Sequence, residues 1–350
     1  MKQSPRTAIL LFNLGGPDSL EAVQPFLQNL FSDPAIIRLP WPLRMLLAKL
    51  ISSRRAPVAR EIYAQMGGAS PILPNTLAQA EALRACLDDL GDVQIFPIMR
   101  YWHPRAKEVA RKVAAAKPDR LVLLPLYPQF STTTSGSSLQ EWEKEAKAVG
   151  LADVPCHSVC CYPDEPGFIA EAAKLIAPRL EEAAAVGKPR LLLSAHGLPE
   201  KIVEAGDPYQ WQVERTAAAI RQALAIEDLD LVVCYQSRVG PLKWIGPATI
   251  DEVRRAGSDK KPLVLAPIAF VSEHSETLVE LDIELAEEAE ASGVPIYLRV
   301  PTVDAGATFI QGLADVVRAA IARGPILSSM TGSRICAAKW SGCPCAGVET

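Results

Sequence analysis

The sequence has no uninterrupted apolar stretch that approaches the ~18 residues a membrane-spanning helix needs. It also has no excess of positive charge. Its 36 Lys and Arg face 40 Asp and Glu, and this net charge of −4 argues against a nucleic-acid partner. The apolar run at residues 8–12 is too short for the hydrophobic region of a signal peptide and better fits a first strand. With 49% hydrophobic and 22% charged residues, the composition is that of a soluble globular protein.

Two glycine-containing segments lack the residues that nucleotide binding requires. Gly15 and Gly16 follow the first predicted strand, but no third glycine arrives in register and Pro17 comes next. The segment TTTSGSS at 132–138 lacks the lysine of a P-loop. The sequence therefore excludes both nucleotide-binding interpretations.

Eight cysteines are unevenly distributed along the chain. Cys86 and Cys234 lie in apolar contexts and are expected to be core residues. The others form a mid-chain and a late group: Cys156, Cys160 and Cys161, then Cys336, Cys343 and Cys345. Because no secretory signal is found, a disulfide framework is not expected. Ligation of zinc or an iron–sulfur cluster is favoured over thiols without a function, and spacing alone does not choose between the two.

Short apolar runs alternate with amphipathic stretches along most of the chain. Runs of this kind predict buried parallel strands covered by helices on both faces. The predicted strands are 7–14, 93–99, 120–128, 154–163, 190–196, 230–236, 263–270 and 295–300. Four strands fall in each half of the chain. We therefore predict an α/β fold of two similar doubly wound, Rossmann-like domains at 1–165 and 166–323, with a Cys-rich appendage at 324–350.

Histidine is scarce, with only four in the chain, and two of the four occupy informative positions. His196 ends the run LLLSAH, and Gly197 allows a sharp turn behind it. In open α/β sheets, chemistry gathers at the carboxyl ends of strands, where a neutral imidazole can accept a proton. His196 is therefore a candidate general base.

The second informative histidine, His274, stands in a row of acidic residues that follows another apolar run. At about 100° per residue, the glutamates of this row fall within roughly an 80° arc of one helix, with leucines on the other side. They are Glu273, Glu276, Glu280 and Glu284. The row could supply oxygen ligands that lead a cation toward the histidine. An acidic stripe is more often a solvated helix face, and that alternative stays open.

The segment 36–51, IIRLPWPLRMLLAKLI, mixes large apolar side chains with cations, and Arg54 and Arg55 follow it. Such a mixture is typical of a segment at a membrane surface. A core-packed helix is the alternative, and Pro40 and Pro42 predict an irregular first half. The residues alone do not decide between the two.

Six segments together resemble the ferrochelatase family, and the resemblance extends over residues 7–322. They are LLFNLGGPDSL (10–20), GGASPI (67–72), LPLYPQFSTTTSGSS (124–138), LLLSAHGLP (191–199), YQSRVGPLKWIGP (235–247) and FVSEHSETLVELDIE (270–284). The resemblance implies an enzyme that inserts ferrous iron into a porphyrin as the last step of haem synthesis. The segment 235–247 looks more like the branch that uses protoporphyrin IX than the one that uses coproporphyrin.

The resemblance also implies roles for the residues around the two histidines. His196 matches the histidine of the family's S-A-H-G-L-P motif and would accept the pyrrole protons. Glu276 matches the acidic partner in the E/D-H-x-E-T motif, with His274 beside it. Glu280 and Glu284, with Glu273, would form a path for metal or protons, because imidazole and carboxylate both suit ferrous iron.

A porphyrin must be bent out of plane for metal insertion, and a tight apolar cleft with aromatic walls can impose that strain. The candidate porphyrin-binding residues are Leu14, Tyr63, Tyr127, Trp244 and Phe270 as walls, and Arg100, Tyr101 and Ser131 on the opposite face or at the propionates. For the aromatic residues, ordinary core packing is the alternative.

The resemblance implies a cofactor and a location as well. Some members of the family hold a 2Fe–2S cluster on one mid-chain and three late cysteines. Here Cys336, Cys343 and Cys345 have a different spacing, and Thr132 stands at the animal mid-chain position, so Cys160 or Cys161 would be the fourth ligand. The apolar lip at 36–55 would contact the inner face of the membrane through 36–51, with the protein in the cytoplasm. A homodimer is left open.

Other functions remain as alternatives. A chelatase for another tetrapyrrole would be expected to have a cationic cleft, which the apolar segment 36–51 does not favour. A haem-binding or haem-delivering protein without insertion activity would not need His196 as a base. An iron–sulfur regulatory or redox protein would depend on the late cysteines instead.

Overall fold

The computed structural model describes residues 5–238, 240 and 242–346, and the chain divides into two compact units. Of the described residues, unit 1 holds 5–161 together with Ala314–Arg334. Unit 2 holds those of Tyr162–Leu313 together with 335–346. The division after Cys161 lies near the predicted boundary at 165. The predicted appendage at 324–350, as far as it is described, is shared between the units.

Unit 1 contains a five-stranded sheet in the order β2-β1-β3-β4-β9, and every pairing in it is parallel. Its strands are β1 (Thr7–Asn13), β2 (Val93–Met99), β3 (Arg120–Pro125), β4 (Cys156–Val159) and β9 (Leu327–Ser328). The first four confirm the predicted strands, with later starts or earlier ends for β1, β3 and β4. No apolar run predicted β9, which is two residues long and lies at the sheet edge.

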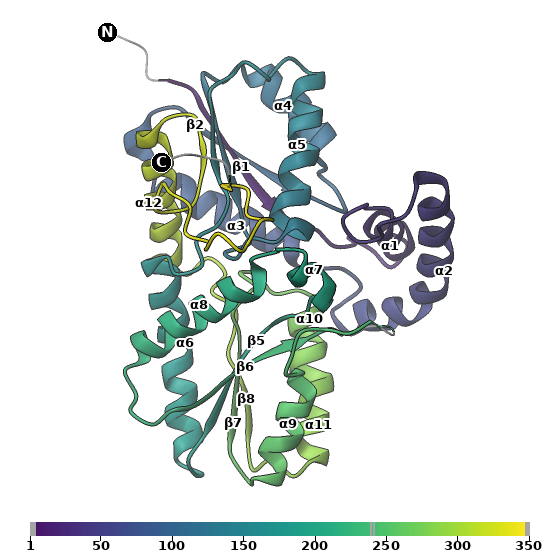
Figure 1. The fold of residues 1–350 in the computed structure, drawn as a ribbon, viewed down its shortest axis with the longest axis vertical. Coiled ribbons are helices and arrows are strands. Elements are labelled where there is room, and N and C mark those ends of the chain that lie inside the picture. The colour runs from purple at the N-terminus through teal and green to yellow at the C-terminus, as the bar shows by residue number, and fades with distance from the viewer. Residues whose placement is uncertain (1–4, 239, 241, 347–350) are drawn as a thin grey trace. The chain divides into compact units, whose positions relative to one another are not determined.

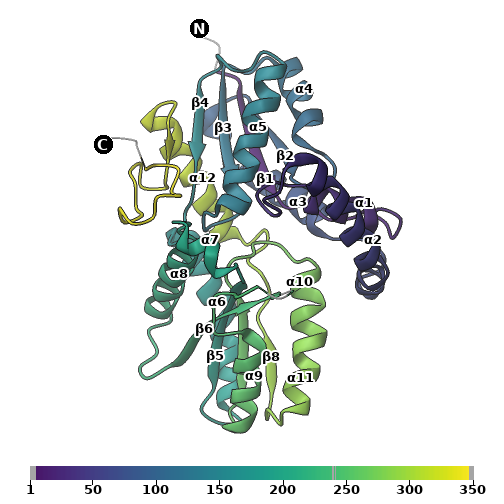
Figure 2. The same cartoon turned by 45° about the vertical axis from the view of Figure 1, so that its right-hand side comes forward.

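Helices cover both faces of this sheet (Figures 1 and 2). On one face, Leu10 and Phe12 of β1 pack against α4 (Ala106–Ala116) and α5 (Ser137–Ala148) through Val109 and Trp142. On the other face, Asn13 donates a hydrogen bond to Thr76 of α3 (Ile72–Ala85) at 3.0 Å. Short turns η1 (Asp88–Leu90) and η2 (Thr132–Gly136) precede β2 and α5.

Two further helices of unit 1, α1 (Val23–Phe31) and α2 (Trp41–Gln65), lie side by side next to the sheet (Figures 1 and 2). The helix α2 begins directly after Pro40, with Pro42 in the first turn, where a missing N–H loses no helical hydrogen bond. It continues far past residue 51, so the predicted segment forms only its first half.

The first half of α2 is not packed into the core. Its large apolar side chains are strongly exposed, with Trp41 67%, Leu43 57%, Leu46 69% and Leu50 46% exposed. The alternative of a core-packed helix is therefore wrong for these residues. None of the helices in the described part of the chain combines the length and apolar composition that crossing a membrane requires.

Unit 2 contains a four-stranded parallel sheet in the order β6-β5-β7-β8. Its strands are β5 (Arg190–His196), β6 (Asp230–Gln236), β7 (Leu263–Pro267) and β8 (Tyr297–Arg299), all within the predicted runs. Leu192 and Leu265 pack on one face against α9 (Thr249–Ser258) and α11 (Leu285–Ala291).

The other face of this sheet contacts α6 (Pro166–Ala184) and α8 (Tyr209–Leu224), which also contact each other (Figure 1). The remaining described helices of unit 2 are α7 (Glu200–Glu204), α10 (Ser275–Leu278) and η3 (Glu280–Glu284). The helix α12 (Ala307–Arg323) begins in unit 2 and continues in unit 1. The predicted doubly wound α/β architecture is thus confirmed, with helices on both faces of two parallel sheets.

Candidate active site

The carboxyl ends of three neighbouring strands in unit 2 bring polar residues together. His196 is the last residue of β5 and Gln236 the last of β6, and the parallel register pairs these two residues directly. On the other side of β5, β7 ends at Pro267, and the chain then leads through His274 into the short helix α10. Apolar strand interiors thus fix the backbone positions of the polar residues that follow them.

His196 and Glu276 form the central contact. The Nδ1 atom of His196 lies 2.9 Å from Oε2 of Glu276, and the two side chains are 36% and 27% exposed. A carboxylate only accepts hydrogen bonds, so Nδ1 carries the proton in this contact. In the neutral ring, the lone pair is then on Nε2. The geometry therefore presets Nε2 of His196 as the proton acceptor.

His274 supports the same glutamate from the start of α10. Its Nε2 lies 3.8 Å from Oε2 of Glu276, and its Nδ1 lies 3.1 Å from the carbonyl oxygen of Ser272. The Phe270 ring packs edge-on against the His274 ring, with the two ring centroids 4.6 Å apart. The His274 N–H donates to the Thr277 hydroxyl at 3.0 Å, a capping contact that fixes the first turn of α10 and with it the position of Glu276.

Gln236 connects the two glutamates to the sheet. Its Nε2 donates to the carbonyl oxygen of Glu276 at 2.8 Å and to Oε2 of Glu280 at 3.2 Å. Its Oε1 accepts from the Ser194 hydroxyl at 2.8 Å. Glu280 also accepts from the backbone N–H of Ser237 at 2.7 Å and from the Ser237 hydroxyl. The sequence pattern assigns Gln236 no role, and only its place at the end of a predicted strand beside His196 points to one.

The carboxylates set the protonation of this cluster. Burial lowers the pKa of His196, but Glu276 and then Glu280 act more strongly together, so the pKa lies above its usual value of 6.5. Burial also opposes ionisation of Glu276, yet His196 and His274 hold the pKa of this carboxyl well below its usual range. For Glu280, burial and the neighbouring Glu276 raise the pKa above 4.5 despite the hydrogen bonds from Ser237.

The predicted continuous helix through the acidic row is wrong. Glu273 lies before the helix, because His274 has an extended backbone and α10 begins only at Ser275. After four residues, α10 passes into η3, a π-helical turn from Glu280 to Glu284. The i→i+5 bonding of such a turn changes the phase of the side chains relative to an α-helix.

The four glutamates therefore have different surroundings. Oε1 of Glu273 accepts from Nη1 of Arg299 at 2.5 Å and from the Thr302 N–H at 2.9 Å. Glu276 and Glu280 share the cluster with His196, whereas Glu284 is exposed to solvent. The structure thus brings Glu276 and Glu280 together, whereas Glu273 pairs with Arg299.

The candidate porphyrin-binding residues of unit 1 are mostly buried. Tyr63 and Tyr101 belong to an apolar cluster with α1, against which Leu14 packs. Ser131 is buried and its hydroxyl accepts from the Thr133 N–H at 3.1 Å. Tyr127 is partly buried, and burial raises the pKa of its hydroxyl.

Arg100 in unit 1 differs from these residues in forming ion pairs with two acidic side chains, Asp33 and Glu141. In unit 2, Trp244 is partly buried and forms an isolated backbone bridge with Pro199, while Phe270 packs on His274.

The cysteines of the predicted cluster lie in both units. Among the residues that the structure describes, no three Cys, His, Asp or Glu side chains form a group that could hold a metal ion. The Cys160 and Cys161 sulfurs in unit 1 are buried and lie 3.4 Å apart. Cys336, Cys343 and Cys345 in unit 2 are also buried, and Gln212 donates to the Cys336 sulfur at 3.2 Å.

Comparisons with known proteins point in one direction. A family model described as Ferrochelatase matches residues 6–321. A protein named ferrochelatase from Caulobacter vibrioides is 54% identical over 344 residues, which cover 97% of each chain. One of the same name from Rickettsia bellii is 46% identical over 347 residues, covering 97% of this chain and 95% of that one.

Among solved structures, SirB from Bacillus subtilis with Fe3+ aligns with 91% of this chain and 96% of its own. The TM-score is 0.49 and the identity 13%. This likeness is too weak to support an argument about chemistry.

Proposed function

The chain belongs to the ferrochelatase family, whose reaction is the insertion of ferrous iron into protoporphyrin in haem synthesis, and we propose that His196 is the base of this reaction. Two pyrrole N–H protons must leave when the metal enters the macrocycle. The observation that carries the proposal is the contact from Nδ1 of His196 to Glu276 at 2.9 Å, which leaves the lone pair of the neutral ring on Nε2.

Glu276 acts through His196 in this proposal. Its carboxylate holds the imidazole in one tautomer and stabilises the imidazolium that forms when a pyrrole proton is accepted. His274 keeps Glu276 ionised, because its ring lies near the same carboxylate oxygen. We assign His196 as the proton acceptor and Glu276 and His274 as its supporting pair.

Glu280 and Glu284 form the proposed path for metal or protons. The pKa of Glu280 is raised by burial and by Glu276, so this carboxyl keeps its proton to a higher pH than a solvated glutamate does. Carboxylate and imidazole both suit ferrous iron, the metal substrate. Glu273 is a weaker candidate, because Arg299 neutralises its charge.

The proposed porphyrin contacts remain those of the sequence motifs: Leu14, Tyr63, Arg100, Tyr101, Tyr127 and Ser131 in unit 1, and Trp244 and Phe270 in unit 2. Phe270 gives the best local support, since its ring packs on His274 and supplies an apolar surface beside this supporting residue. An apolar wall suits protoporphyrin IX, the proposed substrate form, more than a tetrapyrrole with many carboxylates.

The experiment that tests this function mixes the protein with protoporphyrin IX and ferrous iron in the absence of oxygen while the visible spectrum is recorded. Conversion of the free-base bands to metalloporphyrin bands, far above the protein-free rate, is the expected result. Porphyrin bands that shift on binding without converting would instead indicate a haem-binding or haem-delivering protein. Faster conversion of a more carboxylated tetrapyrrole would indicate the other alternative, a chelatase for that substrate.

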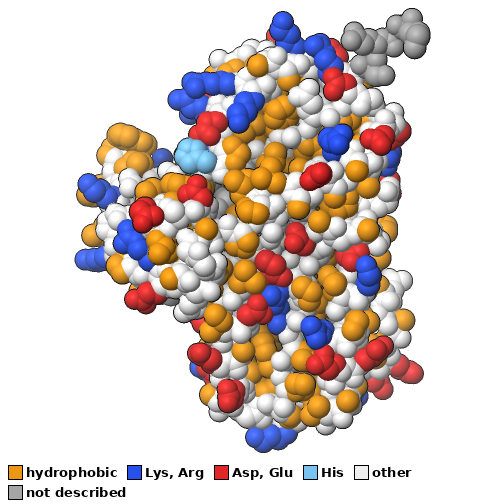
Figure 3. All heavy atoms as spheres, turned by 180° about the vertical axis from the view of Figure 1, so that it is seen from behind, with side chains coloured by type: hydrophobic (Ala, Val, Ile, Leu, Met, Phe, Trp, Pro, Cys, Tyr) orange, Lys and Arg blue, Asp and Glu red, His pale blue; other side chains and the backbone are white. Residues whose placement is uncertain are grey.

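We also propose that the exposed start of α2 contacts the inner face of a membrane, with the enzyme in the cytoplasm. Trp41, Leu43, Leu46 and Leu50 expose apolar surface beside the cations of the same segment, and Figure 3 shows apolar and basic side chains together on this part of the surface. Apolar burial in the interface and attraction to anionic lipids would act together.

Vesicle flotation tests the membrane contact. Leu46→Ser should reduce co-flotation with anionic vesicles, because a 69% exposed leucine is lost from the proposed contact. The matched control is Val58→Ser, which removes an apolar side chain that is 61% exposed on the same helix but beyond residue 51. Equal losses in both variants would contradict a contact confined to 36–51.

The proposed 2Fe–2S cluster on Cys336, Cys343, Cys345 and either Cys160 or Cys161 rests on donor chemistry alone. Thiolates are the ligands such clusters require. Protein prepared without oxygen from iron-replete cells should show visible bands in addition to those of haem, with iron and acid-labile sulfide in equal amounts. Colourless, iron-free protein would contradict it. The proposed alternative of a homodimer is tested by sedimentation of the same preparation.

A further inference from the structure

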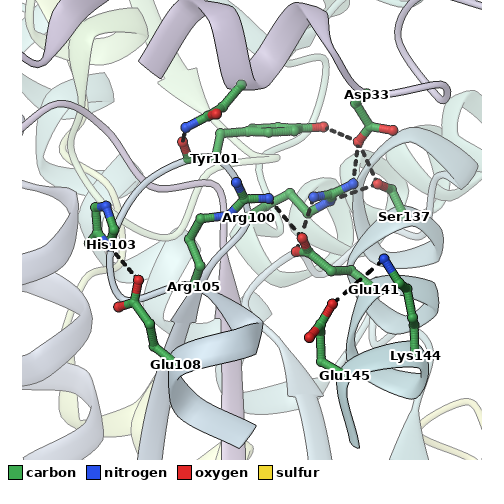
Figure 4. A network of polar contacts seen from close by, with 11 residues as sticks. Asp33, Arg100, Tyr101, His103, Arg105, Glu108, Ser137, Glu141, Lys144 and Glu145 are labelled. Atoms are coloured by element: carbon green, nitrogen blue, oxygen red, sulfur yellow. Dashed lines mark hydrogen bonds and ion pairs between the residues drawn. The ribbon is translucent and has the colours of Figure 1, made fainter. Parts of the chain in front are cut away.

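A buried carboxylate lies just before the lip segment 36–55 in unit 1, in the network that Figure 4 shows. Asp33 follows α1, and its side chain is only 2% exposed. Its Oδ2 atom accepts three hydrogen bonds: from Nη2 of Arg100 at 2.7 Å, from the Tyr101 hydroxyl at 2.8 Å and from the Ser137 hydroxyl at 2.6 Å. One oxygen thus joins the end of β2 to the start of α5.

The same network occupies every nitrogen of the Arg100 guanidinium. Nη2 donates to Asp33, Nε donates to the Ser137 hydroxyl at 2.8 Å, and Nη1 lies 3.0 Å from Glu141. Glu141 is itself held by Arg105 at 2.8 Å. A bidentate bond from Arg100 to a propionate would have to break these contacts. Arg100 is therefore poorly placed to hold a propionate and well placed to be a fixed part of the wall.

The guanidinium is fixed in its plane as well. It stacks over the Tyr101 ring with its central carbon 5.0 Å from the ring centroid. The hydroxyl of this tyrosine donates to Asp33, and burial, then the Asp33 charge, raise its pKa far above the usual value. Tyr101 is thus held neutral, with its ring and hydroxyl in one orientation.

Asp33 also orders the chain that leads into α2. Its Oδ1 accepts from the Ala35 N–H at 2.8 Å, and its carbonyl oxygen accepts from the N–H groups of Ile36 and Ile37 at 3.1 and 2.9 Å. Nearby, Asn29 of α1 donates to the carbonyl oxygen of Tyr101 at 3.0 Å. These bonds tie the first residues of the lip to the strand end that carries Arg100 and Tyr101.

We propose that Asp33 is the positioning residue for porphyrin binding in unit 1: it fixes the directions of the Arg100 guanidinium and the Tyr101 hydroxyl and seats the start of the lip. The inference rests on the proposed porphyrin contacts of these two residues. An asparagine cannot replace the aspartate. Whichever way its amide turns, either the three donors at Oδ2 or the Ala35 N–H would face an NH2 group.

The variant Asp33→Asn tests the proposal through a split between KM and kcat. We expect the KM for protoporphyrin to rise by about tenfold with kcat changed by less than about twofold, the signature of lost binding without lost chemistry. The affinity for metal-free porphyrin, measured by quenching of porphyrin fluorescence, should fall by the same factor. The KM for ferrous iron should not change.

Glu141→Gln is the matched control. It removes the same unit of charge from Arg100 on the other side of the guanidinium, without touching Tyr101 or the lip. We expect porphyrin affinity to change by less than about threefold in this variant. A fall equal to that of Asp33→Asn would show that only the net charge matters, which overturns the positioning role. An unchanged affinity in Asp33→Asn would overturn it directly.

A double-mutant cycle with Arg100→Lys separates this inference from the proposed porphyrin contacts. The double variant combines Asp33→Asn with Arg100→Lys. If Asp33 acts through Arg100, the affinity of the double variant for porphyrin should equal that of whichever single variant binds porphyrin more weakly. If Arg100→Lys and Tyr101→Phe leave porphyrin affinity unchanged, the proposed contacts fail. If these two variants weaken binding and Asp33→Asn does not, only the positioning role fails.

A second variant covers the case in which Asp33→Asn does not fold, as judged by circular dichroism. Ser137→Ala removes one hydrogen-bond donor to Oδ2 of Asp33, and it must still weaken porphyrin binding.

Discussion

Each unit has a cluster of acidic and basic side chains next to the carboxyl end of a strand, and the two clusters differ in how completely their charges are paired. In unit 1, Asp33 and Arg100 are 2% and 12% exposed, and every nitrogen of the arginine has a partner. In unit 2, His196 and Glu276 are 36% and 27% exposed, and the histidine uses one ring nitrogen for the glutamate.

The difference separates a cluster that fixes geometry from one that can exchange protons. Arginine does not deprotonate in proteins, so the pairing around Asp33 has no titratable partner near neutral pH and can only hold shape. Histidine titrates near neutral pH, and its shifted pKa together with the raised pKa of Glu280 is typical of a functional site. Changes in unit 2 should therefore affect turnover, and changes in unit 1 should affect stability and substrate affinity.

The largest effect is expected for His196→Ala. Loss of the base should lower kcat by about a thousandfold, within the range that general base catalysis contributes. Porphyrin affinity should stay nearly the same, because the substitution removes the acceptor and leaves the walls in place. His103→Ala, which changes an exposed histidine that contacts Glu108, is the control and should turn over like the unsubstituted protein. Retained turnover in His196→Ala would refute the assigned role.

The second largest effect is on stability, and it should occur in unit 1. Asp33→Ala leaves the Arg100 guanidinium buried without one of its two carboxylates, and breaking a buried pair in this way lowers the free energy of unfolding by about 3–5 kcal/mol. Urea denaturation measures this loss. His196→Ala should cost far less stability, because the side chain is partly exposed. Equal losses in the two variants would mean that the clusters do not differ as argued.

Much of this arrangement was predictable from the sequence, and the two clusters show where prediction stops. The apolar runs predicted eight of the nine strands in the described part of the chain, and the strand ends marked His196 because neighbouring parallel strands end at one edge. The motif around Glu276 supplied its partner. The strands, the position of His196 and its partner could be predicted because each depends on residues close together in the sequence or on the repeat of a strand.

The features that could not be predicted depend on contacts between distant residues. Gln236 becomes important only because the register of β5 and β6 places it beside His196. Asp33 is one acid in a loop until folding brings it to Arg100 and Ser137, 67 and 104 positions away. The π-helical turn after α10 depends on backbone bonding that a 100° periodicity does not encode, which is why the acidic row was expected to form one helix.

A third, intermediate effect concerns the pH dependence of turnover. Glu276 raises the pKa of His196 against the effect of burial, so the neutral ring that accepts protons predominates only above this raised pKa. In Glu276→Gln the pKa falls, and the acidic limb of the kcat/KM profile should move to lower pH. The maximal rate should fall by about tenfold to a hundredfold, as when a partner that orients a histidine is lost. If the acidic limb of the kcat/KM profile does not move, the group that titrates there is not His196.

The smallest effect sharpens the comparison with two matched serines. Ser194 and Ser137 are both buried, and each donates from its hydroxyl to one acceptor, Oε1 of Gln236 at 2.8 Å and Oδ2 of Asp33 at 2.6 Å. A hydrogen bond to a charged group contributes about 1.5–3 kcal/mol and one between neutral groups about 0.5–1.5 kcal/mol. Ser137→Ala should therefore lower the free energy of unfolding by about 1 kcal/mol more than Ser194→Ala does. Ser194→Ala should in turn slow turnover more, because it loosens the glutamine that holds Glu276 and Glu280. The reverse order in either measurement would contradict the division between a fixed and a reactive cluster.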